Sequence, residues 1–548
     1  MSVLFTSISA GNTVSIQDVR ETFAKLNVSV PESEEDDYQK LLAAIHDCAE
    51  TVAALPDSHP PTDLERFPRN NVHRPTLEEN ILGHAWAHTF SIKDKNPTGC
   101  LTGKTVCLKD CICVAGVPQL LGTDIIDPWT PEADATVVRW ALEAGAEIVG
   151  TAHCENWCQS TSSFSSAQGV VHNPYAEGYS AGGSTSGAAA LVAGGFVDIG
   201  IGADQGGSIR VPASLCGCVG LKPTHGLVPY TGIASNDPID DHAGPLARTV
   251  MEVAQCLDAI SGYDGIDDRS LGAPKHGTTT FASDLLSNPG AKGMRIGVLT
   301  EAFEIALLDK DVKDLVLSAA NKFKDLGATV EEVSVPMHPL GIAIWTIQQR
   351  ISGYLALQGH QTGRHSYGLT GLEEAKLPWT QEKFDKCVFS PPPLYPTSSI
   401  SAFNADRIIQ AFPTTKNIFL NGSYLLTNFP TLYPKTLNLC RQLRASYEHV
   451  FQSYDILITP TTPFVAPKHG KLTTPIETIS PTVGLTSNTV QFDATGHPAM
   501  TIPVGRVEVE RGVRLPVGMQ IIGGMGEDGK VLRAGHAWER AIDWKEMR

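Results

Sequence analysis

The sequence predicts an α/β protein in which a helical segment precedes an α/β core. TVCLKDCICVAG, from residue 105, has the apolar pattern of a strand, and DATVVRWALEAGAEIVGTAH, from residue 134, has the pattern of a helix, a glycine break and a strand. Further on, MRIGVLT and TVEEVSVP flank the helical pattern DVKDLVLSAANKFKDLGA. Strands that alternate with helices indicate an α/β core.

Residues 14 to about 55 are predicted to be helical. The apolar positions recur at roughly helical spacing, and the acidic run Glu32–Asp37 is typical of a helix start. The positions are Val14, Val19, Phe23 and Leu26, then Tyr38, Leu41, Leu42 and Ile45. The Pro- and Asn-rich stretch LPDSHPPTDLERFPRNNVHRP follows as a linker. The segment is either a solvated helical hairpin or an oligomerisation arm.

The remaining elements complete the α/β pattern. YDILITPTTP, AMTIPVG and LPVGMQIIGG read as strands, and KVLRAGHAWERAI reads as a closing helix. Residues 350 to 430 are less regular. Trp345, Tyr354, Phe389 and Tyr395 in and near this region either line a substrate pocket or belong to the core.

Composition excludes several classes of function. The 548 residues carry a net charge of −17 and no Lys/Arg run, so nucleic-acid binding is not expected. The sequence has no signal-peptide pattern and no apolar stretch of the ~18–20 residues that a membrane helix needs. We therefore expect a cytoplasmic protein that has no membrane or nucleic-acid partner.

The twelve cysteines are too dilute for a disulfide scaffold. Two groups stand out, one of three cysteines and one of a histidine with two cysteines. They are Cys107, Cys111 and Cys113, and His153, Cys154 and Cys158. Zinc binding is the alternative, but the spacing is unusual for zinc and no CxxC pair exists. We interpret these cysteines as reduced core residues and expect no metal.

Three short motifs do not meet their structural requirements. Gly178–Gly182 fits the G-x-S-x-G nucleophile elbow, but the preceding VVHNPYAE is polar and contains proline. Gly99–Thr105 is one residue short of a phosphate loop, and Gly200–Gly206 places its third glycine one position late for a dinucleotide fingerprint. A Gly/Ser-rich stretch between 160 and 250 remains. Its apolar segments must be buried, so its glycines lie in loops of the core.

The region from Lys109 to Thr224, which includes this Gly/Ser-rich stretch, resembles the amidase signature family. The resemblance covers nearly the whole chain after about residue 75. Ser184 and Ser208 are 24 residues apart, as are the two serines of that family. One departure exists: Thr185 and Ser186 stand where the family usually has Ser and Gly. The matching elements are Leu108-Lys109-Asp110, Gly182–Gly187, Gly202–Pro212, Gly217–Thr224, Gly244–Arg248, Thr495–Pro498 and Leu515–Gly518.

The resemblance implies a role for each residue of these elements. Ser208 would be the nucleophile, Ser184 a bridging serine in a cis peptide, and Lys109 the base. A lysine accepts a proton only when neutral, so burial would have to lower its pKa from about 10.4. The backbone N–H groups of Gln205, Gly206 and Gly207 would form an oxyanion hole. Loop support would come from Gly183, Thr185, Asp204 and Arg210.

The resemblance also implies a fold and an activity. The fold would be a large mixed β-sheet covered by helices. Its parts would be a helical domain at 1–80, which is a possible dimerisation arm, the core at 81–290 and 421–548, and a small inserted domain at 291–420. The closest type within the family is the nitrile-pathway amidase, which acts on small aliphatic or aromatic carboxamides without a cofactor and often as a homodimer. Carbamate or ester hydrolysis is the alternative, and the glutaminase component of a tRNA-dependent amidotransferase is a third.

Overall fold

The computed structural model describes residues 8–76, 78–360, 367–380, 382–383, 413–470 and 474–547. The chain forms two compact units, Met1–Pro60 and Pro61–Arg548. Phe389 and Tyr395 lie outside the described residues. No helix of the described ranges is both long and apolar enough to cross a bilayer.

The N-terminal unit contains the two expected helices, α1 (Ile16–Lys25) and α2 (Glu35–Ala53). Ser15 begins α1 with a capping box, because its side chain accepts from the Asp18 N–H while the Asp18 carboxylate accepts from the Ser15 N–H. The Arg20 guanidinium joins the helices through two 2.7 Å hydrogen bonds to the Glu35 carboxylate.

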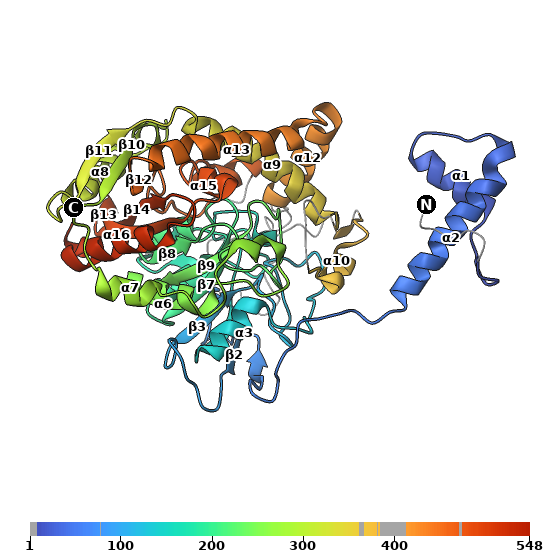
Figure 1. The fold of residues 1–548 in the computed structure, drawn as a ribbon, viewed down its shortest axis with the longest axis horizontal. Helices are drawn as coiled ribbons and strands as arrows, with labels where there is room; N and C mark the ends of the chain where they lie inside the picture. The colour runs from blue at the N-terminus through green and yellow to red at the C-terminus, as the bar shows by residue number, and fades with distance from the viewer. Residues whose placement is uncertain are drawn as a thin grey trace. The chain divides into compact units, whose positions relative to one another are not determined.

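The second unit is built on one large mixed sheet, which confirms the α/β fold class (Figure 1). Twelve strands pair in the order β1-β2-β4-β3-β7-β9-β8-β13-β14-β12-β10-β11. The pairs β3–β4, β3–β7, β10–β11 and β10–β12 are parallel, and the others are antiparallel. A separate small sheet pairs β5 with β6. The strands are β1 (Asn70–His73), β2 (Trp86–Ile92), β3 (Thr105–Lys109), β4 (Glu147–Ala152), β5 (His172–Asn173), β6 (Ala176–Ser180), β7 (Ile199–Asp204), β8 (Val219–Lys222), β9 (His242–Ala247), β10 (Arg295–Leu299), β11 (Thr329–Val333), β12 (Ile456–Pro460), β13 (Ala499–Glu510) and β14 (Val513–Gly523).

The helices pack around this sheet, and α9 contacts both α12 and α13 (Figure 1). The sequence pattern predicts the helix α8 between β10 and β11, but it misses the length of α9, which reaches into the region expected to be irregular. The domain boundaries expected within this unit remain a prediction. The helices are α3 (Thr136–Glu143), α4 (Ser186–Ala193), α5 (Arg210–Cys216), α6 (Val250–Ile260), α7 (Phe281–Ser287), α8 (Lys310–Lys322), α9 (His338–Leu357), α10 (Thr370–Lys376), α12 (Pro413–Asn428), α13 (Leu432–Phe451), α14 (Pro475–Ile479), α15 (Val490–Thr495) and α16 (Asp528–Ala541).

Two parallel neighbours, β3 and β7, bring distant sequence elements to one edge of the sheet. Val106 of β3 pairs with Ile199 of β7, so both strands end at the same edge. The buried helices α4 and α5 follow nearby and pack against each other. Gly202 of β7 allows this close packing, because a Cβ there would lie 2.8 Å from the Thr185 methyl group.

Candidate active site

A lysine and two serines form a continuous hydrogen-bonded row at this edge. The Lys109 ammonium donates to Ser184 Oγ at 2.9 Å, and the Ser184 hydroxyl donates to Ser208 Oγ at 3.0 Å. Lys109 also donates to the Ala203 carbonyl at 3.1 Å. Lys109 and Ser184 are completely buried, while Ser208 is 7% exposed. The row therefore runs from two completely buried side chains to Ser208, the member of the three with some exposure.

Each member of the row comes from a different local structure. Lys109 is the last residue of β3, Ser184 precedes α4, and Ser208 lies between β7 and α5. The Gly183–Ser184 peptide bond is cis. Thr185 ties the two loops together, because its N–H donates to the Ser208 carbonyl at 3.2 Å and its hydroxyl donates to the Ala203 carbonyl at 3.3 Å. Gly183 packs tightly, because a Cβ there would lie 2.7 Å from Glu155 Cγ.

The loop Gln205–Ser208 presents backbone N–H groups beside the exposed serine. The Gly207 N–H donates to Asp204 Oδ1 at 2.5 Å, so the Asp204 carboxylate already uses this donor. Within the described ranges, the N–H groups of Gly206 and Ser208 donate to no protein group. Gly207 has a φ of 130°, a conformation that favours glycine. Within the same ranges the Gln205 N–H also donates to no protein group, so Gln205, Gly206 and Ser208 are the available donors, whereas the Gly207 N–H is occupied and Gly207 shapes the turn.

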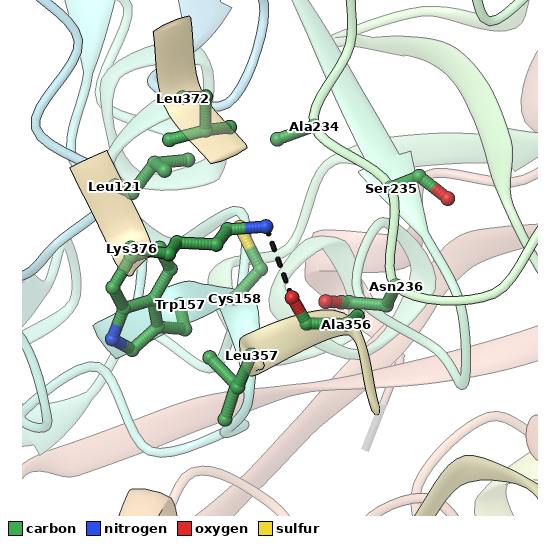
Figure 2. Close-up of a pocket in the computed structure, with 10 residues that line it drawn as sticks. All are labelled: Leu121, Trp157, Cys158, Ala234, Ser235, Asn236, Ala356, Leu357, Leu372 and Lys376. Carbon is green, nitrogen blue, oxygen red and sulfur yellow. Dashed lines mark hydrogen bonds between the residues drawn. The ribbon is translucent and has the colours of Figure 1, made fainter. Parts of the chain in front are cut away.

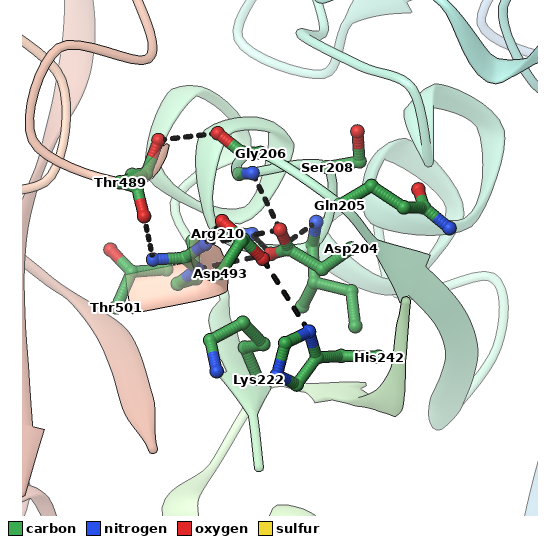
Figure 3. A network of polar contacts seen from close by, with 12 residues as sticks. Asp204, Gln205, Gly206, Ser208, Arg210, Lys222, His242, Thr489, Asp493 and Thr501 are labelled. Carbon is green, nitrogen blue, oxygen red and sulfur yellow. Dashed lines mark hydrogen bonds and ion pairs between the residues drawn. The ribbon is translucent and has the colours of Figure 1, made fainter. Parts of the chain in front are cut away.

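A buried network of ion pairs between Arg210, Asp204 and Asp493 supports this loop (Figure 3). The Arg210 guanidinium donates to both oxygens of Asp204 at 3.0 Å and to Asp493 Oδ2 at 2.6 Å. All three residues are completely buried. Burial acts to raise the pKa of Asp204, but the Arg210 charge and hydrogen bonds prevail and lower it. For Asp493, burial dominates and raises the pKa. The network thus contains one guanidinium, one carboxylate and one carboxyl group that is easily protonated.

Two residues that sequence reasoning did not place hold the loop from its outer side. The Trp345 indole of α9 donates to the Gln205 carbonyl at 2.7 Å, and the Thr489 hydroxyl donates to the Gly206 carbonyl at 2.7 Å (Figure 3). A Cβ on Gly206 would lie 2.3 Å from Trp345 Cζ2. Trp345 therefore packs directly on the loop backbone. The sequence marks Trp345 as an aromatic residue, but it shows no partner.

We expect Trp345→Phe to lower kcat by roughly tenfold, because the Gln205 carbonyl loses its donor and the loop becomes less ordered; a tenfold change corresponds to about 1.4 kcal/mol. Steady-state kinetics with a primary amide would measure the change. Trp538→Phe is the matched control, because the Trp538 indole also donates to a backbone carbonyl, that of Ala319 at 3.3 Å, and neither residue belongs to the loop or lines the pocket. Equal losses in both variants would contradict a specific role for Trp345.

Three cysteines from the two groups noted in the sequence surround the buried lysine. Burial lowers the pKa of Lys109, whereas the nearby thiols of Cys158, Cys111 and Cys154 raise it, and the raising contributions prevail. The expectation that burial leaves Lys109 with a lowered pKa is therefore wrong in its net direction. Hydrogen bonds from the Cys111 and Cys154 thiols lower the pKa of Cys158 well below its ordinary value. No group of His, Cys, Asp or Glu in the described residues is arranged to hold a metal ion.

A small pocket adjoins this cluster (Figure 2). Its walls are mainly apolar, with one ammonium group from Lys376. The Lys376 Nζ donates to the Ala356 carbonyl at 3.1 Å and to Glu373 Oε1 at 2.8 Å. The Ser235 hydroxyl at the pocket wall donates to Asp241, which in turn accepts from the Gln205 side chain at 3.3 Å. The lining residues are Leu121, Trp157, Cys158, Ala234, Ser235, Asn236, Ala356, Leu357, Leu372 and Lys376.

Similarity to known proteins shows that this chain is an amidohydrolase, an enzyme that acts on amide C–N bonds. The sheet described above carries its buried lysine and serine pair. The chain belongs to the amidase family, whose model matches residues 75–532.

An enantioselective amidase from Rhodococcus rhodochrous is 36% identical over 479 residues, which is 85% of each chain. A glutamyl-tRNA(Gln) amidotransferase component from Halothermothrix orenii is 32% identical over 84% of this chain and 88% of its own. The solved structure of a peptide amidase from Stenotrophomonas maltophilia superposes with a TM-score of 0.62 at 25% identity, over 82% of this chain and 84% of its own.

Proposed function

We propose that this amidohydrolase converts small aliphatic or aromatic carboxamides to the carboxylic acid and ammonia through an acyl-enzyme on Ser208. The observation that carries the proposal is the hydrogen-bonded row Lys109–Ser184–Ser208, with spacings of 2.9 and 3.0 Å. The relative named as an enantioselective amidase also supports it.

In the proposed first step, Ser208 Oγ attacks the amide carbonyl carbon. A hydroxyl is a poor nucleophile, so its proton must leave as the new C–O bond forms. The proton passes to Ser184 Oγ while the Ser184 proton passes to Lys109 Nζ. Both transfers run along the existing Ser208–Ser184 and Ser184–Lys109 contacts of 3.0 and 2.9 Å, once Lys109 is neutral and the two hydroxyl hydrogens have turned towards it.

This step requires a neutral Lys109, and the neighbouring thiol provides one way to reach that state. Lys109 and Cys158 are within hydrogen-bonding reach of each other. Charged lysine with thiolate and neutral lysine with thiol contain the same number of protons. Transfer of a proton from Lys109 to the Cys158 thiolate would give the neutral lysine without exchange with solvent, although the raised pKa of Lys109 and the lowered pKa of Cys158 both favour the ion pair.

The negative oxygen of the tetrahedral intermediate would accept hydrogen bonds from the Gly206 and Ser208 N–H groups. One such donor is typically worth about 2.7–4 kcal/mol to the transition state. When the intermediate collapses, the C–N bond breaks and the amine takes its proton from Lys109 through Ser184. Water then attacks the acyl-enzyme by the same route and releases the acid.

Ammonia release from a panel of compounds tests the proposal. The panel contains benzamide, propionamide, a long-chain amide, glutamine and ethyl carbamate. We expect turnover of benzamide and propionamide by the protein alone. Turnover of ethyl carbamate alone would move the function to carbamate hydrolysis. Turnover of glutamine alone would favour an amidotransferase role, which the Halothermothrix orenii relative keeps open.

We also propose that the protein is a cytoplasmic homodimer that pairs through its N-terminal unit. That unit exposes apolar side chains on its own surface, among them Leu26, Val28, Ile45 and Val52. The cysteines of the described residues are unpaired, as in a reducing compartment. Light scattering that gives the mass of a single chain would contradict the dimer.

A further inference from the structure

Cys158 lies between the hydrogen-bonded row and the pocket. Its side chain is half-buried and lines the pocket beside Trp157 and Lys376 (Figure 2). Lys109, Cys111 and Cys154 are the neighbouring groups that act on its thiol and lower its pKa. Cys111 follows β3 and Cys154 follows β4, so two neighbouring strands deliver their thiols to the same point.

The backbone holds Cys158 in this position in an uncommon conformation. Trp157 and Cys158 have φ values of 51° and 60°, in the left-handed region that residues other than glycine seldom adopt. The Trp157 N–H donates to the Leu121 carbonyl at 2.9 Å, and the Cys158 N–H donates to the Glu155 carbonyl at 2.8 Å. Such conformations persist where the surroundings enforce them, and they cluster at functional sites.

The environment of Cys158 differs from that of the other core cysteines. Cys107, Cys113 and Cys256 are completely buried, and burial raises the pKa of each thiol. Cys158 instead combines access from a pocket with a neighbouring ammonium group and two thiol donors. A thiolate is the reactive form of cysteine, and a nearby cation and hydrogen-bond donors favour it.

We propose that Cys158 is an oxidation site for a small uncharged peroxide that enters through the pocket, and that a neighbouring thiol, Cys154 or Cys111, completes the reaction as a disulfide. In the first step the Cys158 sulfur attacks one peroxide oxygen, the O–O bond breaks, and sulfenic acid and water form. In the second step the neighbouring thiol attacks the Cys158 sulfur, the S–O bond breaks, and a second water leaves. Two thiols lose two electrons, and one peroxide is reduced to two waters.

Oxidation at Cys158 is expected to inhibit hydrolysis, and this part rests on the proposed function. The disulfide removes the acidic thiol that exchanges a proton with Lys109. It also draws Cys158 towards Cys154 or Cys111 and away from the lysine. The effect on activity reverses when a thiol reductant restores the pair.

The experiment uses full-length protein that carries Cys48→Ser, Cys100→Ser and Cys387→Ser, so that these three thiols do not react with peroxide. Cys48 and Cys100 are exposed, and Cys387 lies outside the described residues. After hydrogen peroxide treatment, peptide mass mapping is expected to find Cys158 linked to Cys154 or Cys111 with the loss of two hydrogens. Amide hydrolysis is expected to fall in parallel with the linked fraction, and dithiothreitol is expected to restore both.

Two further variants in that background decide the outcome. In Cys158→Ser, neither Cys154 nor Cys111 should be oxidised, whereas Cys256→Ser should behave like the background protein. Absence of oxidation at Cys158 in the background protein would overturn the site. Oxidation at Cys158 with unchanged hydrolysis would overturn the inhibition. The mass readout is also made on Ser208→Ala, so the oxidation site is tested even if none of the amides is a substrate.

Discussion

Ser208→Ala is expected to lower kcat for primary amides by roughly 10⁴–10⁶-fold, the size of loss seen when a serine nucleophile is removed from a hydrolase. The physical reason is that Ser208 carries the hydroxyl at the outer end of the row that begins at Lys109. Ammonia release at saturating benzamide measures the change. The melting temperature should stay near that of the wild type, because Ser208 Oγ makes only the one hydrogen bond, which it accepts from Ser184.

Ser180→Ala is the matched control for this loss. Ser180 is the serine of the Gly178–Gly182 motif and is completely buried; its hydroxyl donates to the Ser162 carbonyl at 2.8 Å and accepts from the Gly182 N–H at 2.9 Å. We expect that variant to lose about 1–3 kcal/mol of stability, because buried partners are left unsatisfied, but to keep most of its activity. If Ser180→Ala were inactive and Ser208→Ala active, the assignment of the nucleophile would be wrong.

Arg210→Met is expected to destabilise the second unit by about 3–5 kcal/mol, because removing one partner of a buried ion pair leaves uncompensated charge. Arg210 is the common partner of Asp204 and Asp493, and its other donors reach the Thr489 carbonyl at 3.0 Å and Gln520 Oε1 at 2.8 Å. Urea unfolding followed by tryptophan fluorescence measures the loss. Activity should fall as well, because Asp204 also binds the Gly207 N–H.

The pH dependence of the stability loss in Arg210→Met provides the control for this prediction. With Arg210 present, the pKa of Asp204 is lowered, so its contribution to stability is present above the unfolded pKa and is lost as pH falls. Without Arg210, burial, which raises the pKa of Asp204, is opposed only by weaker hydrogen bonds such as those from Asp493 and the Ile209 N–H, so we expect the variant to lose stability as pH rises above the unfolded pKa. The difference between wild type and variant should therefore be larger at pH 8 than at pH 5. A penalty independent of pH would indicate lost packing rather than uncompensated charge.

Local patterns predicted most of the regular structure because they reflect local burial. The helix and strand at α3 and β4, the unit β10–α8–β11 and the strands near the C-terminus follow directly from apolar periodicity. The pattern failed at α9, whose sequence HPLGIAIWTIQQRISGYLAL carries apolar side chains on most of its faces. Since α9 packs against α12, α13 and α15, it has no broad polar face to mark it as a helix.

The sequence by itself determined the family and the fold class, and it indicated Lys109, Ser184 and Ser208 as the candidate site residues. Each of these conclusions depends on motifs of consecutive residues, which are visible without a structure. The tertiary structure alone decided that the three side chains form one hydrogen-bonded row, since Lys109 and Ser184 are 75 residues apart. It also decided that Trp345 donates to the Gln205 carbonyl and that Cys158 lies near Lys109. Contacts between distant segments depend on how the sheet pairs β3 with β4 and β7, and no local pattern of residues encodes that pairing.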